Sequence, residues 1–320
     1  MCKNYSIYNL FFVLLLVLMS CETPPKAPKT SIELAIVESN LSQAEQKQGI
    51  ENLRKRLETL GAQNLQIAEL QGQNITFTYE GNIKRPTFDK AFSVAGKLEF
   101  YEVCLEKKVV IDYLQNLSKI TSASDSDTLA ASAATEDEVD LLYGITFVHA
   151  SGPVFGVIPQ ENIEKIRPLL EKGSFYYAPM KKNIQFLLGK QSEKGNYEVY
   201  VVYTDKNGNA ALDGRYVVDA AAEKSSYLDA YTVNLQMNKE GAEIWEQLTA
   251  HVYLARSNIA MVFDTIVYSA PAVTSGAISG GMTEIHGNFT REEAAILATA
   301  IRSGNIPKVE IVSITTLKPN

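Results

Sequence analysis

Alternating apolar and polar positions predict the elements of the first third of the chain. Ile50, Leu53, Leu57 and Leu60 recur at helical spacing, which predicts an amphipathic helix over residues 43–60. The flanking segments have the patterns of strands and of a shorter helix: strands at 32–37, 65–70, 75–79 and 97–103, and the helix at 88–94. The resulting order, βαββαβ, is that of a ferredoxin-like unit.

The last third of the chain repeats this order. Strands are predicted at 231–237, 259–264, 267–270 and 309–314, and helices at 239–250 and 290–303. Either Asn288 or Thr290, together with Glu293, can cap the second helix. The predicted fold class is therefore α+β, with two ferredoxin-like units and an irregular insertion between them. Which sheet receives the last strand is left open by the sequence.

Two features stand out between the units. Residues 121–140 are acidic and of low complexity, which is typical of a loop or linker. Asn207-Gly208 predicts a hairpin turn between strands at 197–204 and 210–218.

The N-terminus has the pattern of an export signal. An apolar run over residues 10–19 follows Lys3 and is too short to span a bilayer of ~30 Å. Cys21 follows Ser20 directly, as in bacterial lipoproteins, so residues 1–20 are predicted to be a lipoprotein signal peptide and Cys21 the lipidated residue. An ordinary uncleaved anchor is the alternative. Residues 21–30 then form a Pro-rich tether.

Composition excludes several classes of protein. The formal net charge is −7 and no basic patch stands out, which argues against nucleic acid as a partner. No phosphate-binding loop is present, so no nucleotide is expected, and no second apolar run is long enough for a membrane helix. Apart from Cys2 and Cys21, the one cysteine is Cys104, which ends an apolar strand and is interpreted as buried.

Candidate catalytic groups do not form a recognisable set. His149, His251 and His286 lack metal-ligand spacing, so no metal or other cofactor is expected. Asp213 and Asp219 could serve as an acid–base pair or as calcium ligands, but roles at turns and strand ends are more frequent. We therefore expect a protein that is not an enzyme.

A known family matches the last 110 residues most clearly. Residues 256–307 carry a hairpin ending in Val267-Tyr268-Ser269-Ala270-Pro271, then Gly280-Gly281, Gly287-Asn288-Phe289-Thr290 and Arg302-Ser303-Gly304. Asp213-Gly214, Asp219 and the segment from Asn238 to Ala242 add earlier matches. Together these closely resemble the first periplasmic domain of the SecD/SecDF protein-export family, over roughly 230 residues.

The resemblance singles out residues with a structural or binding role, none of them catalytic. They are Asp213, Gly214, Asp219, Asn238, Gly241, Ala242, Asp264, Tyr268, Ser269, Ala270, Pro271, Gly280, Gly281, Gly287, Asn288, Phe289, Thr290, Arg302 and Gly304.

The resemblance also implies a domain organisation. A SecD-like base subdomain is expected at 31–104, an insertion with the head-entry strands at 105–229, and the head core at 230–306. The segment 307–320 is expected to be a terminal strand that can return to the base.

The N-terminal pattern and the resemblance together imply a lipoprotein of the cell envelope that faces the periplasm, in the inner or outer membrane. It binds exported or unfolded polypeptide, or docks on the Sec translocon or SecDF, without proton-coupling helices of its own. An envelope lipoprotein that uses the same fold for an unrelated partner is the alternative.

Overall fold

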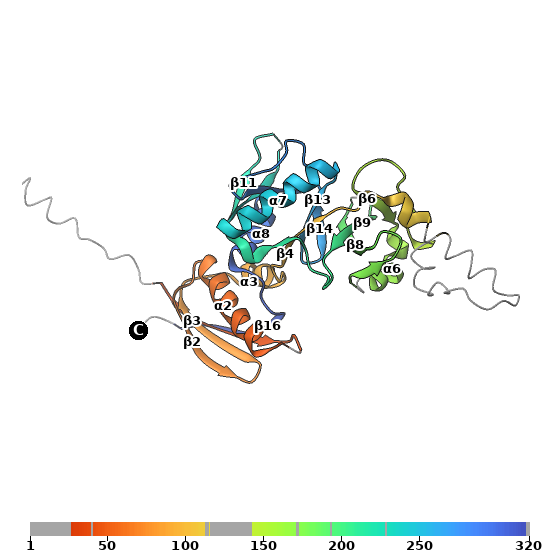
Figure 1. The fold of residues 1–320 in the computed structure, drawn as a ribbon. Coiled ribbons are helices and arrows are strands. Elements are labelled where there is room, and N and C mark those ends of the chain that lie inside the picture. Colours follow the sequence, from red (N-terminus) through yellow and green to blue (C-terminus); the bar gives the residue numbers. More distant parts are fainter. Residues whose placement is uncertain are drawn as a thin grey trace, which may run out of the picture.

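The computed structural model describes residues 27–39, 41–112, 115, 143–170, 173–192, 194–227 and 229–317 (Figure 1). The predicted signal peptide, Cys21, most of the tether and the acidic segment 121–140 lie outside the described residues. The part of the chain that is described forms three sheets and their covering helices.

One antiparallel sheet forms the base, drawn at the bottom of Figure 1. Its strand order is β16-β1-β3-β2. Helices α2 and α3 pack with it around a core that includes Leu53, Phe77 and Phe88, all fully buried. The bounds of its elements are β1 Lys29–Ile36, α2 Gln43–Thr59, β2 Gln63–Gln71, β3 Asn74–Glu80, α3 Arg85–Phe92 and β16 Val309–Leu317.

Local sequence explains the long helix of the base. Ser42 accepts a hydrogen bond from the backbone of Glu45, whose side chain accepts one from the backbone of Ser42, so a capping box starts α2. Leu53 and Leu57 are buried on one face. The helix predicted over 43–60 is thus confirmed to within a residue.

The fourth strand of the base comes from the far end of the chain. β16 pairs antiparallel with β1 over its whole length, from Lys29 opposite Leu317 to Ile36 opposite Val309. The prediction that residues 97–103 would supply this strand is wrong, because that segment, β4 (Leu98–Glu102), pairs with β10 and β13 in another sheet. The last strand therefore returns to the base.

A nine-stranded sheet forms the middle of the molecule. Its strand order is β10-β4-β13-β14-β8-β9-β6-β5, and β7 pairs with β8 at one side. β4 and β13 are buried on both faces, which explains their uninterrupted apolar runs. The bounds of its further elements are β5 Thr146–Phe147, β6 Val154–Ile158, α6 Ile163–Leu170, β7 Phe175–Tyr177, β8 Lys182–Gln191, β9 Tyr197–Thr204, β10 Leu212–Asp213, β13 Ile259–Phe263 and β14 Ile266–Ser269.

The middle sheet curls so that β4 and β9, which are not neighbours in its strand order, come into contact. The backbone N–H of Cys104, just after β4, donates to the carbonyl of Val201 in β9 at 2.8 Å, and Val103 faces Val202 in an isolated bridge. Inside the curl lies a cluster of buried apolar side chains: Tyr101, Val103, Leu187, Tyr200, Val202, Ala260, Val262 and Val267. The strands thus enclose a small core of their own.

A three-stranded sheet with two helices completes the structure. Its order is β11-β12-β15, with β11 at Val217–Lys224, β12 at Tyr231–Met237 and β15 at Met282–Phe289. Helices α7 (Lys239–Ala255) and α8 (Arg291–Ser303) belong to this part. The predicted second ferredoxin-like unit is not found, because β13 and β14 join the middle sheet and β16 joins the base.

The prediction of a hairpin around Asn207-Gly208 is confirmed for its turn and wrong for the pairing of its strands. The turn forms, with Gly208 at φ +84°. However, β9 pairs with β6 and β8, while β10 pairs with β4 and β11 with β12. The chain therefore leaves the turn in a new direction.

Candidate functional site

A polar cavity is lined by residues of β4 and β8 and of nearby loops and turns. Its volume is about 340 Å³, close to the lower end of ligand sites at ~300–1,000 Å³. The lining comes from β4 and the residue before it, β8, the segment just before β7, the turn between β13 and β14, and the turn after β9. Its twelve residues are Lys97, Glu99, Tyr101, Gly173, Ser174, Asn183, Gln185, Leu187, Lys206, Asn207, Gly208 and Thr265.

Buried side chains of β4 form one wall of the cavity. Burial and the neighbouring Glu99 raise the pKa of Tyr101 far above its usual value, so the phenol keeps its proton. Glu99 is itself largely buried, and its carboxylate is 2.9 Å from the ammonium group of Lys97. This wall therefore presents a neutral phenol and an ion pair whose charges already balance.

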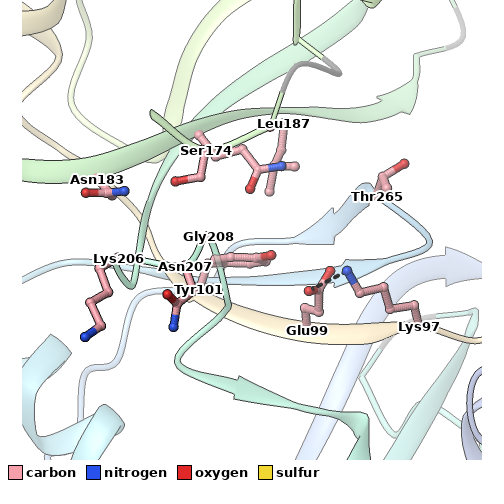
Figure 2. Close-up of a pocket in the computed structure, with 12 residues that line it drawn as sticks. Lys97, Glu99, Tyr101, Ser174, Asn183, Leu187, Lys206, Asn207, Gly208 and Thr265 are labelled. Carbon is pink, nitrogen blue, oxygen red and sulfur yellow. Dashed lines mark ion pairs between the residues drawn. The ribbon is translucent and has the colours of Figure 1, made fainter. Parts of the chain in front are cut away.

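The opposite wall carries amide and hydroxyl groups. Figure 2 shows Ser174 and Asn183 across the cavity from Glu99 and Tyr101. The hydroxyls of Ser174 and Thr204 share a hydrogen bond of 2.5 Å. The lining residues thus present hydrogen-bond donors and acceptors on both walls.

Sequence reasoning missed this cavity. None of its lining residues is among the predicted site residues. Asn207 was noticed as a turn residue, but nothing in the pattern around Asn183 or Gln185 distinguishes them from ordinary half-buried strand positions. Asp213, Asp219 and His286, which would have supported catalysis, do not line it.

A second arrangement joins the base to the rest of the molecule at Arg56. Its guanidinium is fully buried and donates to the carbonyls of Ala91, Val94 and Ala95 near the end of α3, and to those of Ala300 and Gly304 at the end of α8. The C-terminal ends of two helices thus converge on one cation, which favours its charge.

Burial lowers the pKa of Arg56 to about 10, and the attraction of Asp264 opposes this shift. The residue stays charged at neutral pH. It lies on the same helix face as Leu53 and Leu57, and a charged residue at such a position is the sequence signal that could have revealed it.

Asp264 fixes the loop that enters the middle sheet. Its carboxylate accepts hydrogen bonds from the backbone N–H groups of Ala95, Gly96 and Lys97 at 2.7–2.9 Å. Asp264 and Thr265 both have positive φ angles, +47° and +72°, in the tight turn between β13 and β14. The loop after α3 is therefore held against this turn.

Asp219 and Arg302, both singled out by the sequence, meet in the structure. Their side chains are 3.0 Å apart, and Arg302 also donates to the carbonyl of Ala220 at 2.9 Å. Asp213 is engaged elsewhere: it caps a short 3-10 turn, Gly214–Tyr216, and pairs with Arg215. The predicted carboxylate pair is thus divided between two local roles.

The glycine positions around α7 allow close packing. Asn238 caps the helix by accepting from the N–H of Gly241 at 2.8 Å. A Cβ on Gly241 would lie 2.5 Å from Cβ of Tyr216, and one on Gly281 would lie 2.7 Å from Cβ of Ala242. The preceding Gly280 accepts a hydrogen bond from Gln236 through its carbonyl.

Aromatic residues meet a lysine between β8, β14 and β15. The ammonium group of Lys190 lies 4.4 Å from the ring centres of both Tyr268 and Phe289. Asn288 adopts a positive φ of +50°, and a Cβ on Gly287 would lie 2.5 Å from the Phe289 ring.

Thr290 caps α8 in a capping box with Glu293, as expected for one of the two candidate caps. Glu293 has a lowered pKa because it accepts hydrogen bonds from Thr290. At the other end of this helix, Gly304 has φ +79° and its carbonyl is bound by Arg56.

The segment after β14 is tied to the start of β13 by its backbone. The side-chain amide of Asn258 donates to the carbonyl of Ala270 at 2.7 Å, and the N–H of Ile259 donates to that of Pro271 at 3.0 Å. The hydroxyl of Ser269 is buried and has no hydrogen-bond partner within the described structure.

Histidine and cysteine contribute no metal site in the part of the chain that is described, where no three potential ligands gather. His251 lies beside Glu102 and His286 beside Glu284. Cys104 is buried, as predicted, and burial raises the pKa of its thiol. Among the described helices, none combines the length and apolarity that crossing a membrane requires.

Comparison with known proteins shows which family this architecture resembles. Residues 187–308 match the family model described as the SecDF P1 head subdomain. The chain carries a SecDF P1 head subdomain. The matched range begins within β8 and ends just before β16, so this head subdomain includes part of the middle sheet together with the three-stranded sheet.

Relatives of known sequence agree. The protein translocase subunit SecD of Calditerrivibrio nitroreducens is 35% identical over 137 residues, which cover 42% of this chain and 26% of that protein. SecD of Rhodothermus marinus is 29% identical over 214 residues, covering 63% and 33%. The chain thus spans about a quarter to a third of the length of these relatives. Their family supports the expectation of a protein that is not an enzyme.

Solved structures share the fold beyond the head subdomain. A structure of SecDF, a membrane component that enhances protein export, aligns with 90% of this chain and 100% of the compared chain, at a TM-score of 0.50 and 20% identity. SecDF in its super-membrane-facing form aligns with 97% of this chain and 34% of its own, at a TM-score of 0.51 and 19% identity. At such identities the likeness concerns the fold.

Proposed function

We propose that this protein assists protein export at the periplasmic face of the cell envelope by binding exported or unfolded polypeptide or by docking on the Sec translocon or SecDF. The match of residues 187–308 to the SecDF P1 head carries this proposal. It is supported by the fold shared over 90% of the chain with SecDF, a membrane component that enhances protein export.

Exposed apolar side chains on the head subdomain fit such a role. Tyr227, Leu254 and Met282 are 94%, 80% and 66% exposed. They lie after β11, near the end of α7 and at the start of β15 respectively, and each would offer an apolar contact to an unfolded segment or a partner protein.

Membrane attachment through lipid on Cys21 is part of the proposal. It rests on the apolar run before Ser20-Cys21 and the Pro-rich segment after it. Fractionation of cells that express the wild type or Cys21→Ala tests it. Release of the variant from the membrane supports lipidation, whereas a variant that stays in the membrane favours an uncleaved anchor.

Photo-crosslinking in cells tests the function. A photoreactive amino acid replaces Tyr227 on the head, Tyr176 on β7 or Asn207 at the cavity, and adducts are identified by mass spectrometry. The matched control is Gln43, an exposed residue at the start of α2. Adducts with Sec components or exported chains, stronger from the first three positions, are the expected result.

Adducts with other envelope proteins alone would contradict an export role. They would favour the alternative in which the same fold serves an unrelated envelope partner, since a fold by itself does not set a function.

A further inference from the structure

The cavity beside β4 is built to bind an uncharged group. Its most buried charge, on Glu99, is already paired with Lys97 at 2.9 Å. Lys206 lies exposed at the rim, where attraction between charges is weak. Tyr101 is held in its neutral form by burial. A charged ligand would therefore find no buried, unpaired counter-charge among the described residues.

Free carboxamides characterise the cavity. Asn183, Gln185 and Asn207 all line it, and none of their side-chain amides has a hydrogen-bond partner among the described residues. Asn183 and Gln185 alternate along β8, so both point to the same face of the strand. Each carboxamide offers a carbonyl acceptor and N–H donors side by side.

This arrangement matches the chemistry of a peptide bond. A main-chain amide also presents one N–H and one C=O, so a carboxamide can exchange two hydrogen bonds with it. The apolar contribution of the lining is small, with Leu187 as its aliphatic side chain. We propose that the cavity binds the main chain of a short, extended polypeptide segment with small side chains, through Asn183, Gln185 and Asn207.

The inference deepens the proposed function and rests on it. Exported proteins differ in their side chains but share the main chain, so recognition through main-chain amides makes binding independent of sequence. A volume of about 340 Å³ admits a short stretch of chain and no folded element. The exposed apolar residues of the head would contact other parts of the same polypeptide.

A peptide-binding measurement tests this proposal. The probe is a fluorescent twelve-residue Gly-Ser peptide, and its partner is the same peptide with each glycine replaced by sarcosine, which lacks the N–H donor. Binding to the purified protein is followed by fluorescence anisotropy. Loss of two hydrogen bonds is expected to weaken binding of the sarcosine peptide by about tenfold.

Variants assign the binding to the cavity. Asn183→Leu with Gln185→Leu is expected to reduce affinity for the Gly-Ser peptide about tenfold. Asn207→Ala, at an exposed turn, is expected to reduce it less and guards against misfolding of the double variant. Gln43→Leu, which replaces an exposed amide on α2, is the matched control and should leave binding unchanged.

A third probe separates failure of this inference from failure of the proposed function. If a reduced, unfolded secretory protein binds the wild type and both cavity variants equally, the cavity is not the site, while polypeptide binding stands. Absence of binding by the wild type to both this protein and the Gly-Ser peptide contradicts polypeptide binding altogether. Equal affinity for the glycine and sarcosine peptides overturns recognition of the main chain.

Discussion

Arg56 of α2 donates a hydrogen bond to the carbonyl of Gly304, 3.0 Å away at the end of α8. The pair joins a helix of the base to a helix of the head subdomain. Because the same guanidinium serves the ends of both α3 and α8, it holds three helices in one arrangement.

Replacement of Arg56 should lower the stability of the folded protein. Arg56→Met removes the donor of hydrogen bonds to five backbone carbonyls and to the hydroxyl of Ser303, and we expect the free energy of unfolding to fall by about 3–5 kcal/mol. Urea denaturation measures it. Arg54→Met is the control, because Arg54 forms exposed pairs with Glu51 and Glu58 and should cost less than about 1 kcal/mol. Similar losses in both variants would contradict the role of Arg56.

The sequence predicted elements better than their partners, and β4 shows why. A strand buried on both faces has the same apolar pattern whichever sheet it joins, so residues 97–103 could be placed in the base as plausibly as in the middle sheet. The last strand raises the same difficulty, since its partner β1 lies at the opposite end of the chain.

By contrast, contacts between residues close together in the sequence could be predicted from the sequence pattern. Thr290 and Glu293 are three residues apart, and their capping box follows from that spacing. The cavity depends on residues of β4, β8, the segment before β7 and two turns, which are far apart in the sequence. Its free amides carry no pattern of their own, so no reading of β8 alone could identify Asn183 and Gln185.

Alanine substitutions at two glycines of one loop region distinguish the cost of overpacking from the cost of backbone strain. Gly276 and Gly281 have φ angles of +83° and +67°, but a Cβ at Gly276 meets nothing within 4 Å, whereas one at Gly281 lies 2.7 Å from Ala242. Gly276→Ala is expected to cost about 1 kcal/mol through its backbone. Gly281→Ala adds about 1–3 kcal/mol of overpacking.

Thermal unfolding of the two variants provides the comparison. The melting temperature should fall further for Gly281→Ala than for Gly276→Ala. Equal decreases would show that α7 shifts away from Gly281 without cost.

The capping box of α8 should make stability depend on acid pH. Hydrogen bonds from Thr290 lower the pKa of Glu293 below its usual 4.5, so its contribution is complete above that pH and is lost as the pH falls through the lowered value. Glu293→Gln should therefore differ from the wild type at pH 7 and approach it at acid pH. Thr290→Ala should cost about 1 kcal/mol at pH 7. Denaturation curves between pH 3 and 7 test this, and a difference for Glu293→Gln that does not change with pH would contradict it.

The ion pair of Asp219 and Arg302 protects an edge of the three-stranded sheet. The N–H of Ala220 donates to Asp219 and its carbonyl accepts from Arg302, so side chains occupy both polar groups of this residue in the outer strand β11. Arg302→Leu should cost little stability, about 0.5 kcal/mol, because the pair is exposed. It should increase self-association through the uncovered edge.

Sedimentation velocity over a range of protein concentrations measures that association. Arg291→Leu is the control, an exposed arginine at the start of the same helix. If both variants associate equally, the added leucine and not the uncovered edge is responsible.

The pairing of β16 with β1 has a consequence for biosynthesis. A chain delivered from its N-terminus exposes β1 long before β16 exists, so the base sheet stays open while the head subdomain folds. Closing such a long loop adds little entropic cost, because that cost grows slowly with length. In a chain whose head subdomain misfolds, β16 cannot pair with β1, and the backbone N–H and C=O groups along that edge of β1 stay unpaired.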